Sequence, residues 1–170
     1  MEFTQNEPVN KNTVFNKIIE GLSSFMRISY VDDTRPWGGF LCIDENDTNV
    51  FINKFFPHLT QEELQISGKL SPKILIVAPE KRLSWQYHFR RAEIWKVING
   101  KVKVVTSETD EEINNEILSE GMIIELKNGE RHRLIGLEDW GVIAEIWRHT
   151  DIDNPSDESD IVRLQDDYGR

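Results

Sequence analysis

The sequence has little of several features, and each scarcity excludes a class of protein. It contains one cysteine, Cys42, so an internal disulfide is impossible and we expect a reducing compartment, with the cytoplasm as the default location. No apolar run approaches the roughly 20 residues that a membrane helix needs, so we expect no membrane partner. The N-terminus has no basic segment followed by an apolar core and a small-residue cleavage site, so we expect no secretory signal.

Positive charge is also scarce. The chain has 20 Lys and Arg against 30 Asp and Glu, which gives a formal net charge of −10. A nucleic-acid partner would need a clustered basic surface, and none is evident along the chain, so we expect no nucleic acid. A phosphorylated small molecule stays possible, because a few Arg or Lys side chains that converge inside a pocket are enough to bind it.

The length of 170 residues predicts a single domain, since a domain takes roughly 100–200 residues. We divide it into an N-terminal extension, residues 1–32, and a main part, residues 33–170. In the extension, apolar residues follow helical spacing from Thr13 to Met26, with Asn12 or Thr13 as the cap. A second short helix is predicted over Thr60 to Ile66, because Thr60 and Glu63 form a capping-box pattern.

From Lys73 onward, short runs rich in β-branched and aromatic residues predict one strand after another. Asn99-Gly100 and Asn128-Gly129 each separate two such runs, and both predict a tight hairpin. About eight antiparallel strands with such turns indicate an all-β fold, either a barrel or a double-sheet jelly roll such as the cupin. The runs are KILIVAP, RLSWQYHF, EIWKVING, KVKVVTS, INNEILS, MIIELKN, RHRLIGL and WGVIAEIWRH.

Four side chains in these strands have the character of metal ligands. Gln86 and His88 lie on the same face of one strand, about 7 Å apart along it. Glu93 opens the next strand, and His132 follows Asn128-Gly129. This mixed nitrogen and oxygen set suits Zn²⁺ first, with Mn²⁺, Fe²⁺, Co²⁺ or Ni²⁺ also possible. Taken singly, a histidine on a strand is more often a hydrogen-bonded core or surface residue than a ligand.

The spacing of these residues resembles both motifs of the cupin family. Glu80, Lys127 and Gly136 depart from the family's usual glycine, proline and asparagine, but these positions shape turns and do not bind metal. The matching positions are Glu80, Gln86, His88, Glu93, Gly100, Gly121, Gly129 and His132.

Within the cupins, glutamine at the first ligand position is typical of phosphomannose isomerases. Further segments resemble the cupin domain of the type II enzymes, which often follows a mannose-1-phosphate guanylyltransferase; this chain is too short to include that transferase. The resemblance covers residues 33–170. Its segments are Arg35–Gly38, Arg82–His88, Arg91–Trp95, Gly129–Arg133 and Asp160–Arg170.

The resemblance implies a cupin jelly roll with a short N-terminal helical extension and a metal-dependent aldose-ketose isomerase activity. Mannose 6-phosphate and fructose 6-phosphate are the reference substrates, and the reaction moves a proton through an enediol. We expect Glu145 to be the base, or else a partner that holds a ligand histidine. We expect Arg91 to bind phosphate or to stabilise the enediolate, with a surface salt bridge as the alternative.

Substrate contacts are expected from Arg82, which shares the strand face of Gln86 and His88, and from Arg163 and Tyr168. The last two belong to a closing segment that either folds across the barrel mouth or only covers an edge strand. We expect a structural or rim position for Arg133. His58 and His149 match no motif, and we expect both to be exposed to solvent.

A noncatalytic cupin that binds a sugar or a sugar phosphate is the main rival. Ile94, beside Glu93, stands where the resembling isomerases have a histidine, and isoleucine can neither transfer a proton nor hydrogen-bond a substrate. Phe89 and Arg90 replace two further histidines. A metal-dependent oxygenase is a third possibility, disfavoured because glutamine is an uncommon iron ligand. Homodimerisation through an exposed sheet is possible.

Overall fold

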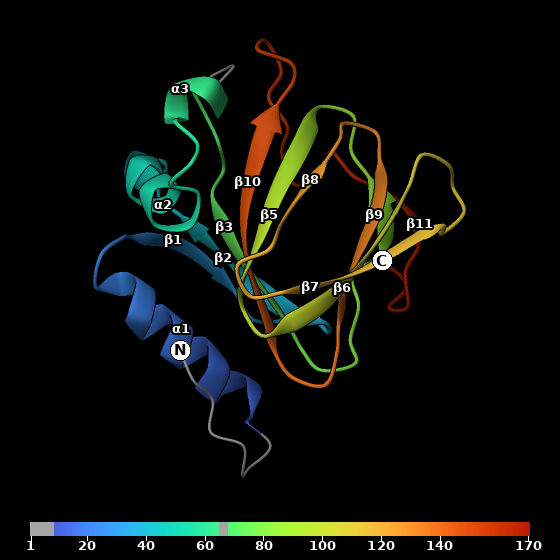
Figure 1. Ribbon diagram of the computed structural model, residues 1–170, viewed down its shortest axis with the longest axis horizontal. Helices are drawn as coiled ribbons and strands as arrows, with labels where there is room; N and C mark the ends of the chain where they lie inside the picture. Colours follow the sequence, from blue (N-terminus) through green and yellow to red (C-terminus); the bar gives the residue numbers. More distant parts are fainter. Residues whose placement is uncertain (1–8, 65–67) are drawn as a thin grey trace.

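A computed structural model describes residues 9–64 and 68–170 of the chain. Two antiparallel sheets face each other, and three helices lie beside one of them (Figure 1). The elements are α1 (Lys11–Ser23), β1 (Ile28–Asp32), β2 (Gly38–Ile43), a 3₁₀ turn (Glu45–Asp47), α2 (Thr48–Phe55), α3 (Gln61–Leu64), β3 (Lys73–Val77), β4 (Trp85–Tyr87), β5 (Arg91–Asn99), β6 (Lys101–Ser107), β7 (Asn114–Ser119), β8 (Ile123–Leu126), β9 (Arg131–Gly136), β10 (Gly141–His149) and β11 (Val162–Gln165).

The order of strands in the sheets is that of a double-sheet jelly roll. The larger sheet runs β1-β2-β3-β10-β5-β8, and the smaller sheet runs β11-β4-β9-β6-β7. The chain crosses from one sheet to the other between β3 and β4, β4 and β5, β5 and β6, β7 and β8, β8 and β9, β9 and β10, and β10 and β11. The predicted all-β jelly roll is therefore confirmed, because repeated crossing of this kind closes two sheets around one interior.

Two separate hydrophobic clusters lie on the two faces of the larger sheet. The inner cluster lies between the sheets and includes Trp95 and Val97 of β5. The outer cluster joins the opposite face to the helices and includes Ile94 of the same strand. Successive side chains of a strand point to opposite faces, so β2, β3, β5 and β10 each contribute to both clusters.

The N-terminal helix begins earlier than predicted. It spans Lys11–Ser23, and Asn10, not Asn12 or Thr13, is its cap, because the Asn10 side chain accepts a hydrogen bond from the Thr13 backbone N–H at 2.9 Å. Its buried residues belong to the outer cluster, so the helix covers the larger sheet. The segment assigned as an extension also contributes β1, which pairs with β2 as an edge strand of that sheet.

Neither predicted tight hairpin forms. Asn99-Gly100 joins β5 of the larger sheet to β6 of the smaller one, and Asn128-Gly129 joins β8 to β9 in the same way. Gly100 and Gly129 do have positive φ values, 76° and 78°, so the local turn chemistry is as expected. Each turn sends the chain across to the other sheet, because the strand that follows finds its partners there.

The connection between β2 and β3 holds one expected and one unexpected helix. Helix α3 has the predicted capping box: Thr60 N–H donates to Glu63 at 2.9 Å, and Glu63 N–H donates back at 3.3 Å. The end of the predicted helix, residues 65–66, lies outside the described residues. Helix α2 was not predicted, and its buried residues pack in the outer cluster.

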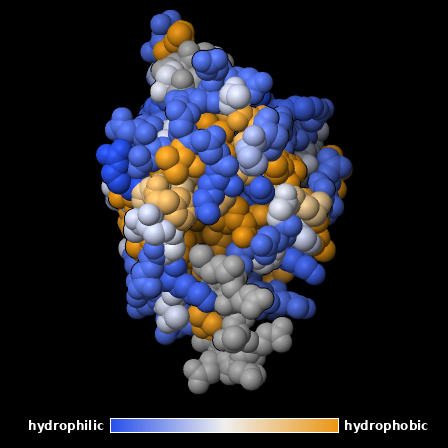
Figure 2. Space-filling model, turned by 60° about the vertical axis from the view of Figure 1, so that its left-hand side comes forward, coloured by the Kyte–Doolittle hydropathy of each residue, from blue (hydrophilic) through white to orange (hydrophobic). Residues whose placement is uncertain are grey.

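The helical side of the molecule presents a largely hydrophilic surface, with hydrophobic residues gathered near its centre (Figure 2). Among residues 9–64 and 68–170, no helix combines the length and the apolar character that crossing a membrane requires.

Candidate metal centre

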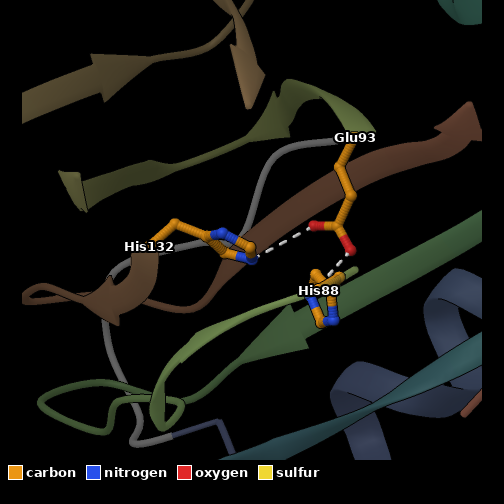
Figure 3. Close-up of side chains that lie close together, drawn as sticks. All are labelled: His88, Glu93 and His132. Carbon is orange, nitrogen blue, oxygen red and sulfur yellow. Dashed lines mark ion pairs between the residues drawn. The ribbon is translucent and has the colours of Figure 1, made fainter. Parts of the chain in front are cut away.

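Three of the four predicted ligands converge at one end of the interior (Figure 3). His88 follows β4, Glu93 lies in β5 and His132 lies in β9, so both sheets contribute to the group. One ligand atom from each residue lies within 4.8 Å of the others, and all three side chains are buried. The turn after β4 and the crossing before β9 bring these positions together, although His88 and His132 are far apart in the sequence.

The two imidazoles are held so that the same nitrogen is left for a ligand role. His88 Nδ1 lies 2.6 Å from the Asp160 carbonyl oxygen, and His132 Nδ1 lies 3.0 Å from the Glu130 carbonyl oxygen. A carbonyl oxygen only accepts, so each Nδ1 carries the proton and donates it. The Nε2 lone pair of each ring therefore lies on the Glu93 side; in His88 it accepts a hydrogen bond from an Arg91 Nη at 3.1 Å, and in His132 it has no donor among the described residues.

Glu93 carries the negative charge of this group. Its Oε1 lies 3.2 Å from His88 Nε2, and its Oε2 lies 3.4 Å from His132 Nε2. Burial opposes ionisation of Glu93, but positive charge on the neighbouring His88 and Arg91 holds its pKa well below the usual range. Burial lowers the pKa of His88, which favours the neutral ring, so Arg91 supplies the lasting positive charge.

Arg91 is buried and fixes the position of Glu93. Its Nε donates to Glu93 Oε1 at 2.7 Å, one Nη lies 3.1 Å from His88 Nε2, and the other donates to Ser156 Oγ at 2.8 Å. Its guanidinium carbon lies 3.6 Å from the centre of the Trp147 ring. The alternative of a surface salt bridge therefore does not hold for this residue.

Two atoms of the group fit a cation because no other partner satisfies them. Among the described residues, Glu93 Oε2 and His132 Nε2 are buried without a hydrogen-bond partner. An unpaired buried acceptor is unfavourable, and these two acceptors face each other, so a shared divalent cation would satisfy both. The set of two imidazoles and one carboxylate suits Zn²⁺ and other first-row divalent ions alike.

Gln86, the fourth predicted ligand, lies beside this group. It is the register partner of His132 across β4 and β9, and it lines the cavity next to the centre. Its amide oxygen accepts a hydrogen bond from Ser84 Oγ at 2.5 Å. The structure therefore places Gln86 at the cavity wall, with its oxygen engaged by a neighbouring hydroxyl.

The cavity next to the centre is lined by charged and aromatic side chains. Glu93, Glu145 and Lys73 contribute from the larger sheet, and Trp95 and Trp147 contribute aromatic wall. Lys73 is only 5% exposed and was not predicted as a site residue. The sequence carries a signal for Lys73, because it has the same strand parity as the inward residues Leu75 and Val77 of β3. This parity could have identified Lys73 as a residue of the interior.

Glu145, the predicted base, is buried in this wall. The Trp95 indole N–H donates to its Oε1 at 2.9 Å, and Lys73 is its register partner on β3. Burial and the negative charge of Glu93 raise the pKa of Glu145 to about 8. A carboxyl group of this kind holds a proton at neutral pH and is able to exchange it there.

The predicted substrate-binding residues separate into two groups. Arg163, in β11, lines the cavity. Arg82 does not, because it is paired with Asp167 at 2.7 Å on the outside, so its expected inward direction is corrected. Tyr168 packs against the inner cluster and is not part of the cavity lining. The closing segment adds β11 to the edge strand β4 and also brings Arg163 to the cavity, which combines the two predicted alternatives.

Of three further residues with expected positions, His149 lies elsewhere, whereas Arg133 and His58 lie as expected. His149 is fully buried, not exposed. Its Nδ1 accepts from Ser156 N–H at 3.0 Å and its Nε2 lies 3.3 Å from Ser71 Oγ, so both nitrogens serve the structure. Arg133 is 1% exposed and donates to Leu83 O and Glu112, a structural position as expected. His58 is exposed, as expected.

Ile94 points away from the metal centre. It is 2% exposed and packs in the outer cluster with α1 and α2 residues, on the opposite face of β5 from Glu93. The register confirms this, since Ile94 is opposite Ile146 and Glu93 is opposite Trp147 on β10. A histidine at position 94 would face the helices, so its absence does not alter the cavity.

Comparisons with known proteins agree with the fold. The capsular polysaccharide assembling protein CapF from Staphylococcus aureus matches with a TM-score of 0.56 at 15% identity, over 80% of this chain and 34% of that one. CapF with the inhibitor 3-isopropenyl-tropolone matches with a TM-score of 0.57 at 13% identity, over the same shares. This chain thus spans about a third of the CapF length, and the likeness shows the fold alone.

No curated protein matches the sequence. The family model described as mannose-6-phosphate isomerase C-terminal matches residues 44–166, a range that holds all four predicted ligands and nearly all of the strands. The match covers most of the chain and includes His88, Glu93 and His132. The chain is therefore a cupin that belongs to the mannose-6-phosphate isomerase C-terminal family.

Proposed function

We propose that this protein is a metal-dependent aldose-ketose isomerase acting on a sugar phosphate of the mannose 6-phosphate type. The observation that carries the proposal is the pair of unsatisfied buried atoms, Glu93 Oε2 and His132 Nε2, beside a cavity that contains Glu145 and Lys73. Membership of the mannose-6-phosphate isomerase C-terminal family supports the reaction class.

His88, Glu93 and His132 would hold the cation, with Gln86 as a further oxygen donor once it leaves Ser84. A bound divalent cation polarises the carbonyl and hydroxyl oxygens of the substrate and lowers the free energy of the enediolate. Arg91 is a positioning residue in this proposal, because its guanidinium fixes the Glu93 carboxylate and lies against Trp147.

Glu145 would move the proton. In the enediol route, a base removes the proton from the hydroxyl-bearing carbon next to the carbonyl and returns it to the former carbonyl carbon, while the hydroxyl proton passes to the former carbonyl oxygen. The negative charge of Glu93 is one cause of the raised pKa of Glu145, and a cation at the centre offsets that charge. Lys73, its neighbour across the sheet, also favours the ionised carboxylate. The loaded site therefore supports a base that works near neutral pH.

The rival, a noncatalytic sugar-binding cupin, depended on Ile94. Since Ile94 faces the helices, the substitution removes nothing from the cavity and does not favour that rival. The cavity also keeps an ionisable group, Glu145, where binding alone would need none.

The test is incubation of the protein, loaded in turn with Zn²⁺, Mn²⁺ and Co²⁺, with mannose 6-phosphate and an enzymatic fructose 6-phosphate readout. We expect turnover with at least one ion, and deuterium from D₂O in the product because an enediol exchanges its proton with solvent. Glu145→Gln should lower kcat by about 10²- to 10⁴-fold. Absence of turnover with every ion tested would refute the isomerase proposal.

A further inference from the structure

A second group of charged side chains lines the same cavity and takes no part in the metal centre. It contains one carboxylate and four cations, drawn from the larger sheet, the loop after β1, the loop before β11 and the C-terminal segment. We call it the basic cluster. Its members are Arg35, Lys73, Glu158, Arg163 and Arg170.

Lys73 is the buried member of the basic cluster. Its side chain is 7% exposed, and its ammonium lies 3.8 Å from the centre of the Trp147 ring and 5.0 Å from that of Phe40. Its ion-pair partner among the described residues is Glu158, whose own side chain is 65% exposed. A buried cation thus depends for its counter-charge on a carboxylate that reaches in from an exposed loop.

Arg163 gives the basic cluster its excess positive charge. Arg35 pairs with Asp32 at 2.8 Å and Arg170 pairs with Asp166 at 3.0 Å, but Arg163 makes no side-chain hydrogen bond or ion pair with any residue in 9–64 and 68–170. Such an excess stands out in a chain whose formal net charge is −10. A guanidinium at the mouth of a cavity is suited to bind the oxygens of an anion.

We propose that Lys73 and Arg163 form the subsite for the phosphate group of the substrate, and that the Glu158 carboxylate occupies this subsite in the free protein. The inference rests on the proposed function for the identity of the sugar phosphate. A phosphate monoester and a carboxylate are both oxyanions, so the substrate displaces Glu158 from Lys73 and competes with it. Glu158 is thereby a residue of this chain that sets the affinity for the anion.

The other carboxyl group near Lys73 does not oppose this arrangement. The Glu145 carboxyl is engaged by the Trp95 indole N–H, which donates to its Oε1 at 2.9 Å, whereas Lys73 forms its ion pair with Glu158. Burial lowers the pKa of Arg163, and the negative charge of Glu158 opposes this change. Glu158 therefore interacts electrostatically with Arg163 as well as with Lys73.

The test is calorimetric titration of the full chain with inorganic phosphate after removal of metal by a chelator, so that phosphate cannot ligate a cation. Glu158→Gln should raise the association constant about two- to fivefold, the range of a displaced exposed ion pair. Asp153→Asn is the matched control, because it removes the same charge from the same exposed loop, away from the cavity, and should change nothing. An equal effect of the two variants would overturn the competition by Glu158.

Arg163→Met and Lys73→Met should each weaken phosphate binding about tenfold or more, because each removes a charged hydrogen-bond donor. Arg163 is exposed, so its variant tests the subsite without disturbing the core, and Arg163→Lys should retain part of the binding. Unchanged phosphate affinity in Arg163→Met would overturn the subsite.

The subsite and the isomerase activity fail separately. Turnover of mannose 6-phosphate with an unchanged KM in Arg163→Met would overturn the subsite and leave the isomerase proposal standing. Phosphate binding that responds as expected, without turnover on any metal, would support the subsite and refute the isomerase proposal.

Discussion

The two faces of the larger sheet are built from the same strands but have opposite chemistry. The face toward the helices is mostly apolar, with Ile76 of β3, Ile94 of β5 and Ile146 of β10. The face toward the smaller sheet changes in polarity along the strands. In β5 its residues are Glu93, then Trp95, then Val97. The first face can therefore only hold the fold together, and the second divides into a core and a site.

The charged residues of the inner face lie at the same end of three neighbouring strands. Lys73 begins β3, Glu93 lies near the start of β5, and Glu145 lies at the middle of β10, which runs antiparallel to both. Three strands therefore contribute their polar residues at the same end of the interior. The opposite end is filled by side chains such as Val77 and Val97, which supply a rigid base for the site.

The largest expected effect separates ligand histidines from structural ones. His132→Ala should weaken divalent metal binding by at least about 100-fold, since even outer partners of a ligand contribute 10- to 100-fold. Elemental analysis after dialysis against a known free metal concentration measures this change.

Two other histidines serve as controls for that substitution. His58→Ala alters an exposed histidine, and His149→Gln alters a buried histidine whose two nitrogens are both occupied. Both variants should retain metal. Retention of metal by His132→Ala itself, in folded protein by circular dichroism, would contradict the metal centre.

The next effect compares neighbours on the two faces of β5. Ile94→Ala should lower the free energy of unfolding by about 2–5 kcal/mol, because it leaves a cavity in the outer cluster. Metal content and kcat should stay at wild-type values, since the side chain points to the helices. Urea unfolding followed by fluorescence measures the stability, and a loss of metal without a loss of stability would reverse the assignment of faces.

A smaller effect concerns the two turns that send the chain across the sheets. A Cβ on Gly100 would lie 2.5 Å from the Trp140 carbonyl oxygen, whereas a Cβ on Gly129 would meet nothing within 4 Å. Gly129→Ala should cost about 1 kcal/mol for its positive φ, and Gly100→Ala about 2–3 kcal/mol because the contact adds to it. Equal losses in urea unfolding would show that the Trp140 contact relaxes freely.

The smallest effect is the pH dependence that His149 contributes. Burial lowers its pKa from 6.5 to about 4, so the unfolded chain takes up a proton first as the pH falls. The free energy of unfolding that this pKa difference contributes is complete above pH 6.5 and is lost toward pH 4. Between pH 7 and 5.5 the loss amounts to about 1 kcal/mol. Urea unfolding of wild type and His149→Gln at both pH values checks this, and a constant difference between them would exclude the titration.

Local pattern was enough to predict much of the site. Gln86 and His88 are two residues apart in an extended run, so they point into the same interior, and the runs that hold Glu93 and His132 became strands β5 and β9. The same alternation accounts for Ile94, which lies on the opposite face of β5 from Glu93. These features depend on the geometry of a single strand, which the sequence encodes directly.

Other features depend on contacts between distant segments. Asn99-Gly100 specifies a turn, but not whether the next strand pairs with the previous one or crosses to another sheet. His149 has no local mark of burial, because its partners Ser71 and Ser156 come from two separate loops. Arg82 shares the parity of Gln86, but Asp167 in the C-terminal segment draws it outward.

The sequence by itself determined most of the strands, the inward and outward faces of β5 and the candidate ligand residues, because these follow from residue type, motif spacing and a period of two. Only the tertiary structure decided which strands meet, and with that the approach of His132 to Glu93, the burial of Lys73 and the pairing of Lys73 with Glu158. Such contacts join residues dozens of positions apart, and their free energy depends on burial and charge that exist only after the two sheets have closed.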